Sequence, residues 1–545
     1  MITGAEAMRR CLEAEGVTTI FGYPGAAIHH FYEELSNVDT IKHILVRQEQ
    51  NAGHMASGYS RTTGKVGVCL VTSGPGASNL FTAIATAYMD SIPMVAITGQ
   101  VNSNLLGRDV FQEIDTTGAV APFIKHSYLI KDANDIPRIF KEAFYIAQSG
   151  RPGPVLIDVP VDIQKHMLNF TYPETVNLRG YKPTTEGNAK QIKKVAETIS
   201  DAERPLLCLG GGVFSADARD LAIRLSEEAG VPVVTTMMGV GALPSAHPMN
   251  LGMIGSFGHI TANKALNETD LIVIIGARVG DRAFTSSWNV AKKAKTIHID
   301  IDPAEIGKNV STTIPLVGDI KLVLAKLLEE KPKADCKPWL EILCSAALTE
   351  KSKIASARQN TIGPKRLMRE LGLQIQEDAI VVADVGQNQI WAARYLNIQN
   401  GRFLTTGGLG TMGYSLPAAI GAKIANPDRQ TLVICGDGSF QMMFNELSTM
   451  AENCLDLKII LVNNHTLGMV CELQRIECYK NFCVTLPANP DFQILASAFG
   501  VKSRCIIADE DMAGAIDEML KHKGPFLLEC IVSPDEGTKT MDEVI

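Results

Sequence analysis

Short runs of apolar, β-branched residues recur along the whole chain, and each is followed by a longer stretch with helical periodicity. Early examples are VGVCLVTSG and PMVAITG, central ones are RPLLCLGGG and DLIVIIGA, and late ones are QTLVICGDG and KIILVNN. Strands buried on both faces have this composition, and parallel strands need helical crossovers to connect them. The pattern predicts an α/β protein built from doubly wound parallel sheets.

At 545 residues the chain is too long for a single hydrophobic core. Two polar, irregular stretches interrupt the alternating pattern, one from Gln164 to about Lys190 and one from about Glu330 to Lys365. We therefore expect three α/β domains, at residues 1–165, 188–335 and 362–545. The first and third of these domains are candidates for distant copies of one fold.

The charge of the chain limits its partners. A net charge of −8 without a polybasic segment argues against binding to nucleic acid or to an anionic membrane. No signal-like start and no membrane-spanning apolar run is present, so we expect a cytoplasmic protein. The 12 cysteines include no CxxC pair, and we expect reduced, mostly buried thiols.

Two polar motifs follow two of the late strands. Gly436-Asp437-Gly438 ends one predicted strand, and Asn463-Asn464 ends the next. Because the carboxyl ends of parallel strands share one edge of a sheet, these side chains are expected to lie together. Asp437 and Asn464, with the carbonyl oxygen of Thr466, offer the hard oxygen donors that Mg²⁺ prefers.

The residues after the first motif predict a continuous helix. Gly438 and Ser439 lead into FQMMFNELSTMAEN, whose first N–H groups are expected to face a bound phosphate. Each motif alone is an ordinary turn, but the spacing and strand context of the two agree. Together they resemble the signature of thiamine-diphosphate enzymes, which binds Mg²⁺ and through it the diphosphate of the cofactor.

Thiamine chemistry requires a carboxylic acid that hydrogen-bonds the aminopyrimidine ring. Glu49, in ILVRQEQNAGHM, lies directly after a predicted strand and before a helical run. The alternative reading is a first-turn glutamate that interacts only with its own helix dipole. The neighbouring segments GYPGAAI, VTSGPGASNL and AYMDSIPMVAITGQV favour the cofactor role.

These segments, together with GGLGTMGYSLPAAIGA, GDGSFQM, NNHTLGMV and HIDIDPAEIGKN, resemble the acetolactate synthase family through most of the chain. The resemblance implies a pyrimidine-binding first domain, a central Rossmann-like domain and a diphosphate-binding third domain. It also implies thiamine-diphosphate- and Mg²⁺-dependent decarboxylation of a 2-oxo acid such as pyruvate. Carboligation to a second 2-oxo acid would then give an acetolactate-type 2-hydroxy-3-oxo acid, a precursor of branched-chain amino acids.

The resemblance also implies roles for individual residues. Glu49 is the activating acid, and Phe111, Gln112 and Lys125 approach the substrate. Met412 props the folded cofactor. The implied thiamine-diphosphate residues, besides the metal ligands Asp437, Asn464 and Thr466, are Gly386, Gln387, Asn388, Gly410, Met412, Gly438, Ser439, Leu467, Gly468 and Met469.

An FAD site is implied in the central domain, where the family's flavin is largely structural. Arg278 is expected near the FAD diphosphate and Asp300 near the adenosine. The full set of implied FAD residues is Arg151, Gly210, Gly211, Gly212, Gly276, Arg278, Asp300, Ile301 and Asp319.

Several residues depart from the family pattern, and they gather around the expected reaction centre. Leu473 stands where the family usually has a tryptophan, and Ala26 replaces a glycine. Gln48 and Asn388 replace two histidines, and the chain ends at Ile545 without the family's longer arm. GMIGSFG and GARVGDR also differ from the usual flavin segments. The acceptor substrate therefore stays open.

Three hypotheses follow. The first is carboligation of two 2-oxo acids, and the second is a related thiamine enzyme: a decarboxylase, a C–C hydrolase or a carboligase with another acceptor. The third is a catalytically silent paralogue, against which the retention of Glu49, Asp437 and Asn464 argues. Since Glu49 lies in the first domain and Asp437 in the third, we expect a homodimer or homotetramer whose site combines two chains. A small regulatory subunit is a further candidate partner.

Overall fold

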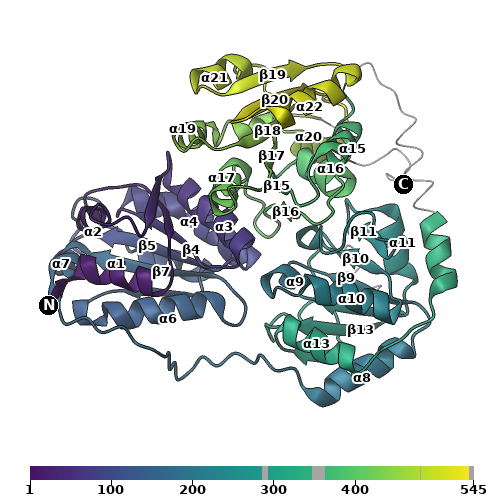
Figure 1. The fold of residues 1–545 in the computed structure, drawn as a ribbon, viewed down its shortest axis with the longest axis horizontal. Helices are drawn as coiled ribbons and strands as arrows, with labels where there is room; N and C mark the ends of the chain where they lie inside the picture. The colour runs from purple at the N-terminus through teal and green to yellow at the C-terminus, as the bar shows by residue number, and fades with distance from the viewer. Residues whose placement is uncertain (285–292, 346–361, 479, 539–545) are drawn as a thin grey trace.

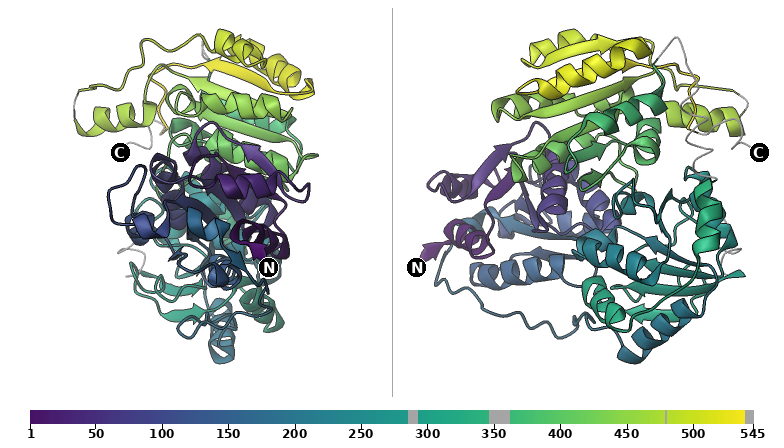
Figure 2. Two further views of the ribbon diagram at one scale, coloured as in Figure 1. Left: turned by 90° about the vertical axis from the view of Figure 1, so that its left-hand side faces the viewer. Right: turned by 45° about the vertical axis from the view of Figure 1, so that its right-hand side comes forward.

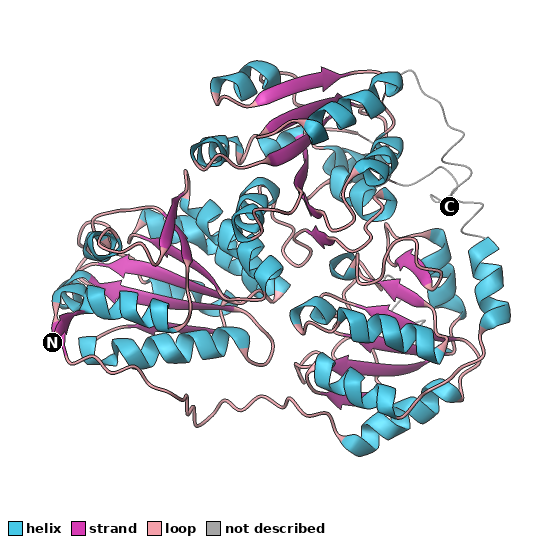
Figure 3. Cartoon of the chain, viewed as in Figure 1, coloured by secondary structure: helices cyan, strands magenta, loops and turns pink. Residues whose placement is uncertain are grey.

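Three parallel sheets, each of six strands, form the framework of the protein (Figure 1). The computed structural model describes residues 1–545 except 285–292, 346–361, 479 and 539–545. In Figure 3 each sheet lies between helices, as the alternating sequence pattern predicts. The predicted fold class of doubly wound α/β domains is confirmed.

The first domain contains a sheet with the strand order β3-β2-β4-β5-β7-β6. A two-stranded antiparallel pair, β1-β8, lies at its side. The strands are β1 (Ile2–Thr3), β2 (Thr19–Gly22), β3 (Lys42–Leu45), β4 (Gly67–Val71), β5 (Met94–Gln100), β6 (His126–Leu129), β7 (Pro154–Pro160) and β8 (Met167–Leu168). The helices are α1 (Gly4–Ala14), α2 (His29–Leu35), α3 (Glu49–Thr63), α4 (Pro75–Asp90), α5 (Thr116–Val120), α6 (Ile136–Gln148) and α7 (Val161–Lys165).

The third domain repeats this topology, because its order β16-β15-β17-β18-β20-β19 places successive strands in the same sequence of positions. This agreement supports the interpretation that the two domains are copies of one fold. The strands are β15 (Ile380–Ala383), β16 (Arg402–Leu404), β17 (Thr431–Gly436), β18 (Leu457–Asn463), β19 (Lys502–Ile506) and β20 (Phe526–Ile531). The helices are α15 (Pro364–Gln374), α16 (Gln387–Tyr395), α17 (Ser415–Ala425), α18 (Asp437–Phe440), α19 (Leu447–Glu452), α20 (Gly468–Glu477), α21 (Phe492–Ala498) and α22 (Met512–Lys521).

The central domain has the strand order β11-β10-β9-β12-β13-β14, which is that of a dinucleotide-binding fold. The order reverses between β9 and β12, so a ligand site is expected at their carboxyl ends. The strands are β9 (Pro205–Leu209), β10 (Val233–Thr235), β11 (Asn250–Met253), β12 (Leu271–Ile275), β13 (Lys295–Asp300) and β14 (Ile314–Val317). The helices are α8 (Ala189–Ser200), α9 (Gly212–Ser215), α10 (Arg219–Ala229), α11 (Ile260–Glu268) and α13 (Ile320–Glu329).

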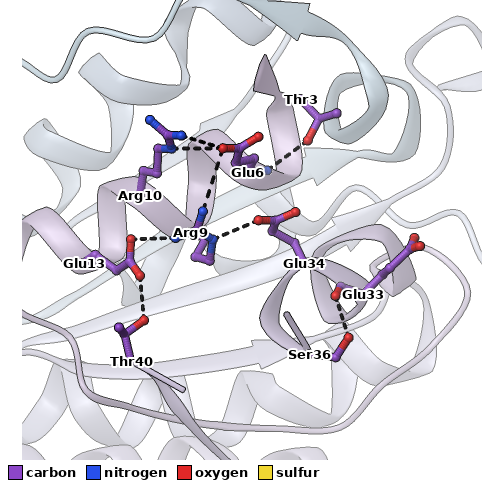
Figure 4. Close-up of polar contacts among 9 residues, drawn as sticks. All are labelled: Thr3, Glu6, Arg9, Arg10, Glu13, Glu33, Glu34, Ser36 and Thr40. Carbon is purple, nitrogen blue, oxygen red and sulfur yellow. Dashed lines mark hydrogen bonds and ion pairs between the residues drawn. The ribbon is translucent and has the colours of Figure 1, made fainter. Parts of the chain in front are cut away.

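The amino-terminal helix is fixed by polar contacts at both ends (Figure 4). Thr3 caps α1 by accepting the N–H of Glu6 at 3.1 Å. Arg9 then connects α1 to α2 through Glu34 at 2.9 Å and also binds Glu13 within its own helix. These contacts orient α1 and α2, which cover the face of the first sheet away from the third domain.

The first and third domains share one hydrophobic core. Successive side chains of β4 and β17 point to opposite faces, so that Cys69 and Cys435 enter the shared core while Leu70 and Ile434 enter separate ones. Helices α3 and α17 cross at the centre of the shared core. In both views of Figure 2 the green and yellow third domain lies above the purple first domain.

The predicted helix after the GDG motif is wrong. The segment is not one continuous helix: Asp437–Phe440 (α18) and Leu447–Glu452 (α19) are separate α-helices, and a short 3-10 turn, η5 (Phe444–Glu446), precedes α19. The backbone leaves helical geometry at Met443, where φ is −141°. This break turns Glu446 toward the first domain, where it forms buried hydrogen bonds that outweigh helix propensity.

The connections between domains follow the expected positions only in part. Between β8 and α8 the chain runs without helix or strand, while α7 and β8 occupy the start of the predicted separator. Part of the second separator, residues 346–361, and the end of the third domain, residues 539–545, lie outside the described residues. We keep 1–165, 188–335 and 362–545 as proposed domain limits. No helix in the described part of the chain is long and apolar enough to cross a membrane.

The crossing of α3 and α17 allows a test of the shared core. A Cβ atom added at Gly421 would lie 1.9 Å from the carbonyl oxygen of Met55, whereas one added at Gly514 on α22 would meet no atom within 4 Å. Gly421→Ala should lower the free energy of unfolding by roughly 1–3 kcal/mol through overpacking. Gly514→Ala should raise it by about 0.5–1 kcal/mol. Urea unfolding measures both changes, and equal effects of the two substitutions would contradict the packing described.

Candidate active site

The two polar motifs of the third domain meet at one edge of its sheet. Strands β17 and β18 pair in parallel, with Gly436 opposite Val462, so that Asp437 and Asn464 follow neighbouring strand ends. Asp437 is buried, and its Oδ2 accepts a hydrogen bond from Asn489 Nδ2 at 2.7 Å. Burial raises the pKa of the Asp437 carboxyl, against the hydrogen bond from Asn489. The structure thus brings the predicted metal ligands to the same edge.

The second ligand, Asn464, belongs to a buried polar network. Its Oδ1 accepts the N–H of Thr466, and its Nδ2 donates to Gln387 Oε1, both at 3.1 Å. The hydroxyl of Thr466 is buried without a hydrogen-bond partner. A Cβ atom added at Gly468 would lie 2.0 Å from Gln387 Oε1, so a side chain here would displace the Gln387 amide from Asn464. Oxygen donors and an unsatisfied hydroxyl in this position fit a Mg²⁺ ion with its diphosphate.

A residue that sequence reasoning missed, Asp384, organises the loop that carries Met412. Its carboxylate is fully buried and accepts N–H groups from Gly413 at 3.0 Å and from Ser415 at 2.8 Å. Burial raises the pKa of this carboxyl, while the backbone hydrogen bonds lower it. Asn388 also donates to the Asp384 carbonyl at 2.7 Å. Asp384 therefore fixes the predicted cofactor loops to the end of β15.

Glu49 is the first residue of α3, as the sequence predicts. Its Oε2 accepts a hydrogen bond from Asn79 Nδ2 of α4 at 2.9 Å. Gly76 lies close by, since a Cβ atom there would be 3.5 Å from Glu49 Oε1. Among the residues that the structure describes, the Glu49 carboxylate forms no hydrogen bond with the third domain of its own chain.

The other residues predicted near the substrate are placed differently. Phe111 is 87% exposed, and Gln112 packs against Gly74, beside the start of α4. Lys125 Nζ instead donates to the carbonyl oxygen of Ser149 at 2.8 Å, to the carbonyl of Ile146 and to a tyrosine hydroxyl. Burial lowers the pKa of Lys125 to about 8. A contact between Lys125 and substrate would require one of these bonds to open.

A cavity of about 980 Å³ lies where all three domains meet. Guanidinium groups from each domain line it, including Arg61, Arg151, Arg278 and Arg402. The predicted FAD residues on its wall are Arg151, Gly211, Gly212, Gly276, Arg278, Asp300, Ile301 and Asp319. The remaining one, Gly210, packs closely against Ala277.

Several polar groups on the cavity wall lack an ion-pair or hydrogen-bond partner among the described residues. Arg278 forms no ion pair with any described residue, and burial lowers its pKa. Buried oxygen atoms of Asp90 and Thr406 also lack hydrogen-bond partners. Burial raises the pKa of Asp300 to about 6. A cavity with an unpaired arginine and unsatisfied hydrogen-bonding groups, beside the reversal of strand order, fits a dinucleotide cofactor such as FAD.

Arg151 fixes the first domain to the central one at the edge of this cavity. Its guanidinium binds Glu305 at 2.8 Å and Asp302 at 3.4 Å, and its Nε donates to Ser91 at 2.9 Å. The same cavity reaches the third domain at Gly386, Gly410, Met469 and Leu473. The residue that replaces the family's tryptophan, Leu473, therefore lies on the wall of this cavity.

The carboxyl-terminal segment, residues 536–538, is hydrogen-bonded to the third domain through Glu472. Glu472 is a second residue that could not be predicted from the sequence. Glu472 accepts the Thr538 N–H at 3.0 Å and its hydroxyl at 2.8 Å, and also Gln387 Nε2 at 2.9 Å. Trp391 Nε1 donates to the Gly537 carbonyl at 3.3 Å. Residues 536–538 thus pack against α16 and α20, next to Gln387.

Comparison with known families gives matches along nearly the whole chain. Residues 2–119 match the N-terminal TPP binding domain of thiamine pyrophosphate enzymes, residues 192–327 their central domain and residues 384–530 their C-terminal TPP binding domain. Each match lies within one of the three parallel-sheet domains, although the first ends before β6 and β7 and the third begins after β15.

Individual relatives are similar over most of their length. The probable acetolactate synthase large subunit of Methanococcus aeolicus is 44% identical, covering 98% of this chain and 93% of the relative. That of Methanocaldococcus jannaschii is also 44% identical, with 98% and 92% covered. The acetolactate synthase large subunit of Corynebacterium glutamicum is 42% identical, with 98% and 87% covered.

The contact between Glu472 and the carboxyl-terminal segment can be tested directly. Glu472→Ala removes a charged acceptor, whose hydrogen bonds contribute about 1.5–3 kcal/mol. The amide of Thr538 should then exchange at least roughly 10-fold faster in hydrogen-exchange mass spectrometry of the 533–538 peptide. Glu477→Ala, at the exposed end of the same helix, is the control and should leave that peptide unchanged. Equal protection in Glu472→Ala and the native protein would contradict the contact.

Proposed function

The chain belongs to the thiamine pyrophosphate enzymes and, among them, to the acetolactate synthase large-subunit family, and from this premise we propose that it joins two 2-oxo acids. The proposed reaction decarboxylates pyruvate and couples the remaining two-carbon unit to a second 2-oxo acid. The product is a 2-hydroxy-3-oxo acid of the acetolactate type. The observation that carries this proposal is the meeting of Asp437 and Asn464 at neighbouring strand ends of a thiamine-pyrophosphate-binding domain.

Thiamine diphosphate, when bound, supplies the electron sink that allows a 2-oxo acid to lose CO₂ and form a new carbon–carbon bond. In this proposal Asp437, Asn464 and the Thr466 carbonyl hold Mg²⁺. The residues proposed to surround the cofactor are Gly386, Gln387, Asn388, Gly410, Met412, Gly438, Ser439, Leu467, Gly468 and Met469. The buried hydrogen bonds of Asp384 to the Met412 loop, and the separate bond between Asn464 and Gln387, support this assignment because they fix the loops that carry these residues.

Glu49 is the proposed activating acid. It holds a proton at one carboxyl oxygen for the aminopyrimidine ring, while Asn79 fixes Oε2. The protein otherwise contributes placement and exclusion of water, since no nucleophilic triad is needed. Phe111, Gln112 and Lys125 remain proposed substrate neighbours.

We propose that the cavity between the three domains holds FAD in a structural role. Arg278 would pair with its diphosphate and Asp300 with its adenosine. The unpaired guanidinium of Arg278 and the strand order of the central domain support this assignment. The acidic groups that bind Arg151 keep that arginine at the cavity edge.

A second chain is the proposed partner, in a homodimer or homotetramer. Large apolar side chains are exposed on the segments that carry the proposed site residues: Phe111 at 87%, Met442 at 54% and Leu409 at 47% on loops, and Val470 at 45% at the start of α20. Exposed apolar groups gathered near a site are typical of an interface. In the proposed assembly Glu49 of one chain would face the metal edge of the other. The relatives are named large subunits, which supports a small regulatory subunit as a further partner.

A related thiamine enzyme with another acceptor is the second candidate. It is favoured by Leu473 on the cavity wall and by Ala26, which is exposed in the loop after β2. Replacing an indole by an isobutyl group leaves more room, and one hydrophobic contact changes substrate preference by about 1–3 kcal/mol. The identity of the second substrate therefore separates the two candidates.

The proposed reaction is tested by incubating the protein with thiamine diphosphate, Mg²⁺ and pyruvate, with and without 2-oxobutyrate, and identifying products by mass spectrometry. We expect acetolactate from pyruvate alone. Glu49→Gln should slow exchange of the cofactor's C2 proton by about 10²–10⁴-fold, because the ring loses its acid. Glu33→Gln, an exposed carboxylate in the same domain, is the matched control. Near-native exchange in Glu49→Gln would remove Glu49 from this role, and acetaldehyde as the sole product would favour the second candidate.

A further inference from the structure

Glu446, a buried carboxylate of the third domain, accepts hydrogen bonds from residues on both sides of Glu49 in the sequence. Glu446 has no exposed surface, and its Oε1 accepts the backbone N–H of Arg47 and the Asn51 side-chain Nδ2, each at 2.8 Å. Its Oε2 accepts the hydroxyl of Thr449 at 2.6 Å. Among the described residues Glu446 forms no ion pair, since the Arg47 guanidinium binds Glu452 and the Leu45 carbonyl instead.

The start of α3 has no capping side chain of its own. Gln48 precedes the helix in an extended conformation, with φ −157°, and makes no capping hydrogen bond. The Asn51 N–H is satisfied by the Gln48 carbonyl at 3.0 Å. Glu446 therefore supplies, from another domain, a hydrogen-bond acceptor for the residues on either side of this helix start.

Burying a carboxylate without a cation is costly, and burial raises the pKa of Glu446. A contact that only joined two domains could be made by apolar side chains at lower cost. The two Glu446 bonds to residues 47 and 51 instead close a short loop that contains Glu49 at its centre. The Thr449 hydroxyl, whose one proton is shared between Glu446 and this backbone, also lies 3.2 Å from the Leu45 carbonyl oxygen, so η5 and α19 contact the junction between β3 and α3.

We propose that Glu446 is a positioning residue for Glu49: by accepting hydrogen bonds from Arg47 and Asn51, it fixes the direction in which the activating carboxyl group points. This inference rests on the proposed role of Glu49. Glu446 itself does not contact the cofactor or exchange protons with it. A displacement of about 1 Å at a reacting group can reduce the reaction rate by about 10²-fold. The gain in rate from a fixed helix start can therefore outweigh the free-energy cost of burying the Glu446 carboxylate.

The positioning role predicts that activity depends on a hydrogen-bond acceptor oxygen at residue 446 and does not depend on its negative charge. In Glu446→Gln, the amide oxygen can still accept from Arg47 and Asn51, and its NH₂ can donate to Thr449, whose hydroxyl donates to Leu45. This variant should keep kcat within about 3-fold of native. Glu446→Ala loses both bonds and should lower kcat and C2 proton exchange by about 10- to 100-fold, with KM for pyruvate nearly unchanged.

The matched control is Glu452→Ala. Glu452 lies on the same α19 and binds the same Arg47, but through the guanidinium at 2.7 Å on an exposed surface. Its loss should leave C2 exchange and kcat near native values. Because Glu446→Ala can fail to fold, Asn51→Ala provides a milder second variant, which removes one of the two bonds and should slow C2 exchange in a folded protein.

The cofactor-free protein gives a separate readout. Hydrogen-exchange mass spectrometry of the peptide containing the Arg47 amide should show faster exchange in Glu446→Ala and native-like exchange in Glu446→Gln and Glu452→Ala. Native C2 exchange in folded Glu446→Ala or Asn51→Ala would overturn the inference, as would a Glu446→Gln variant as slow as Glu446→Ala. Normal exchange in Glu49→Gln would instead overturn the proposed function on which the inference rests.

Discussion

The close crossing of α3 and α17 is the contact on which the rest of the structure depends. Backbone meets backbone there, because Gly421 leaves room for the Met55 carbonyl, and the first and third sheets share one core around this crossing. The same contact brings η5 and α19 to the start of α3, where Glu446 binds residues on both sides of Glu49. It also sets the distance at which both domains can line a common cavity with the central domain.

Much of this arrangement could be predicted from the sequence, because strand composition and the edge rule of parallel sheets are local or general. Asp437, Asn464 and Glu49 follow strands in the places expected. The long helix after Asp437 was not correctly predicted, since its break at Met443 depends on a bond between Glu446 and Arg47, 399 residues apart. Asp384 and Glu472 were missed for a related reason: their partners become neighbours only after folding.

The positions of the residues that depart from the family pattern indicate what each departure can affect. Leu473 lies on the cavity wall beside Met469, so it alters a surface that a ligand can touch. Asn388, in place of a histidine, donates to the Asp384 carbonyl and supports the loop rather than opening it. Of these departures, Leu473 is the one placed to affect the proposed choice of acceptor, while the groups proposed to bind Mg²⁺ and activate the cofactor are all present.

The central claim is that Glu49 of one chain and Asp437 of another complete one thiamine site. Mixing inactive Glu49→Gln with inactive Asp437→Ala, under conditions that exchange subunits, tests it most directly. Half of the dimers in a statistical mixture carry both chains, and each would hold one intact site, so activity should return to about a quarter of native. A mixture that stays inactive despite proven heterodimers would mean that the site is built within one chain.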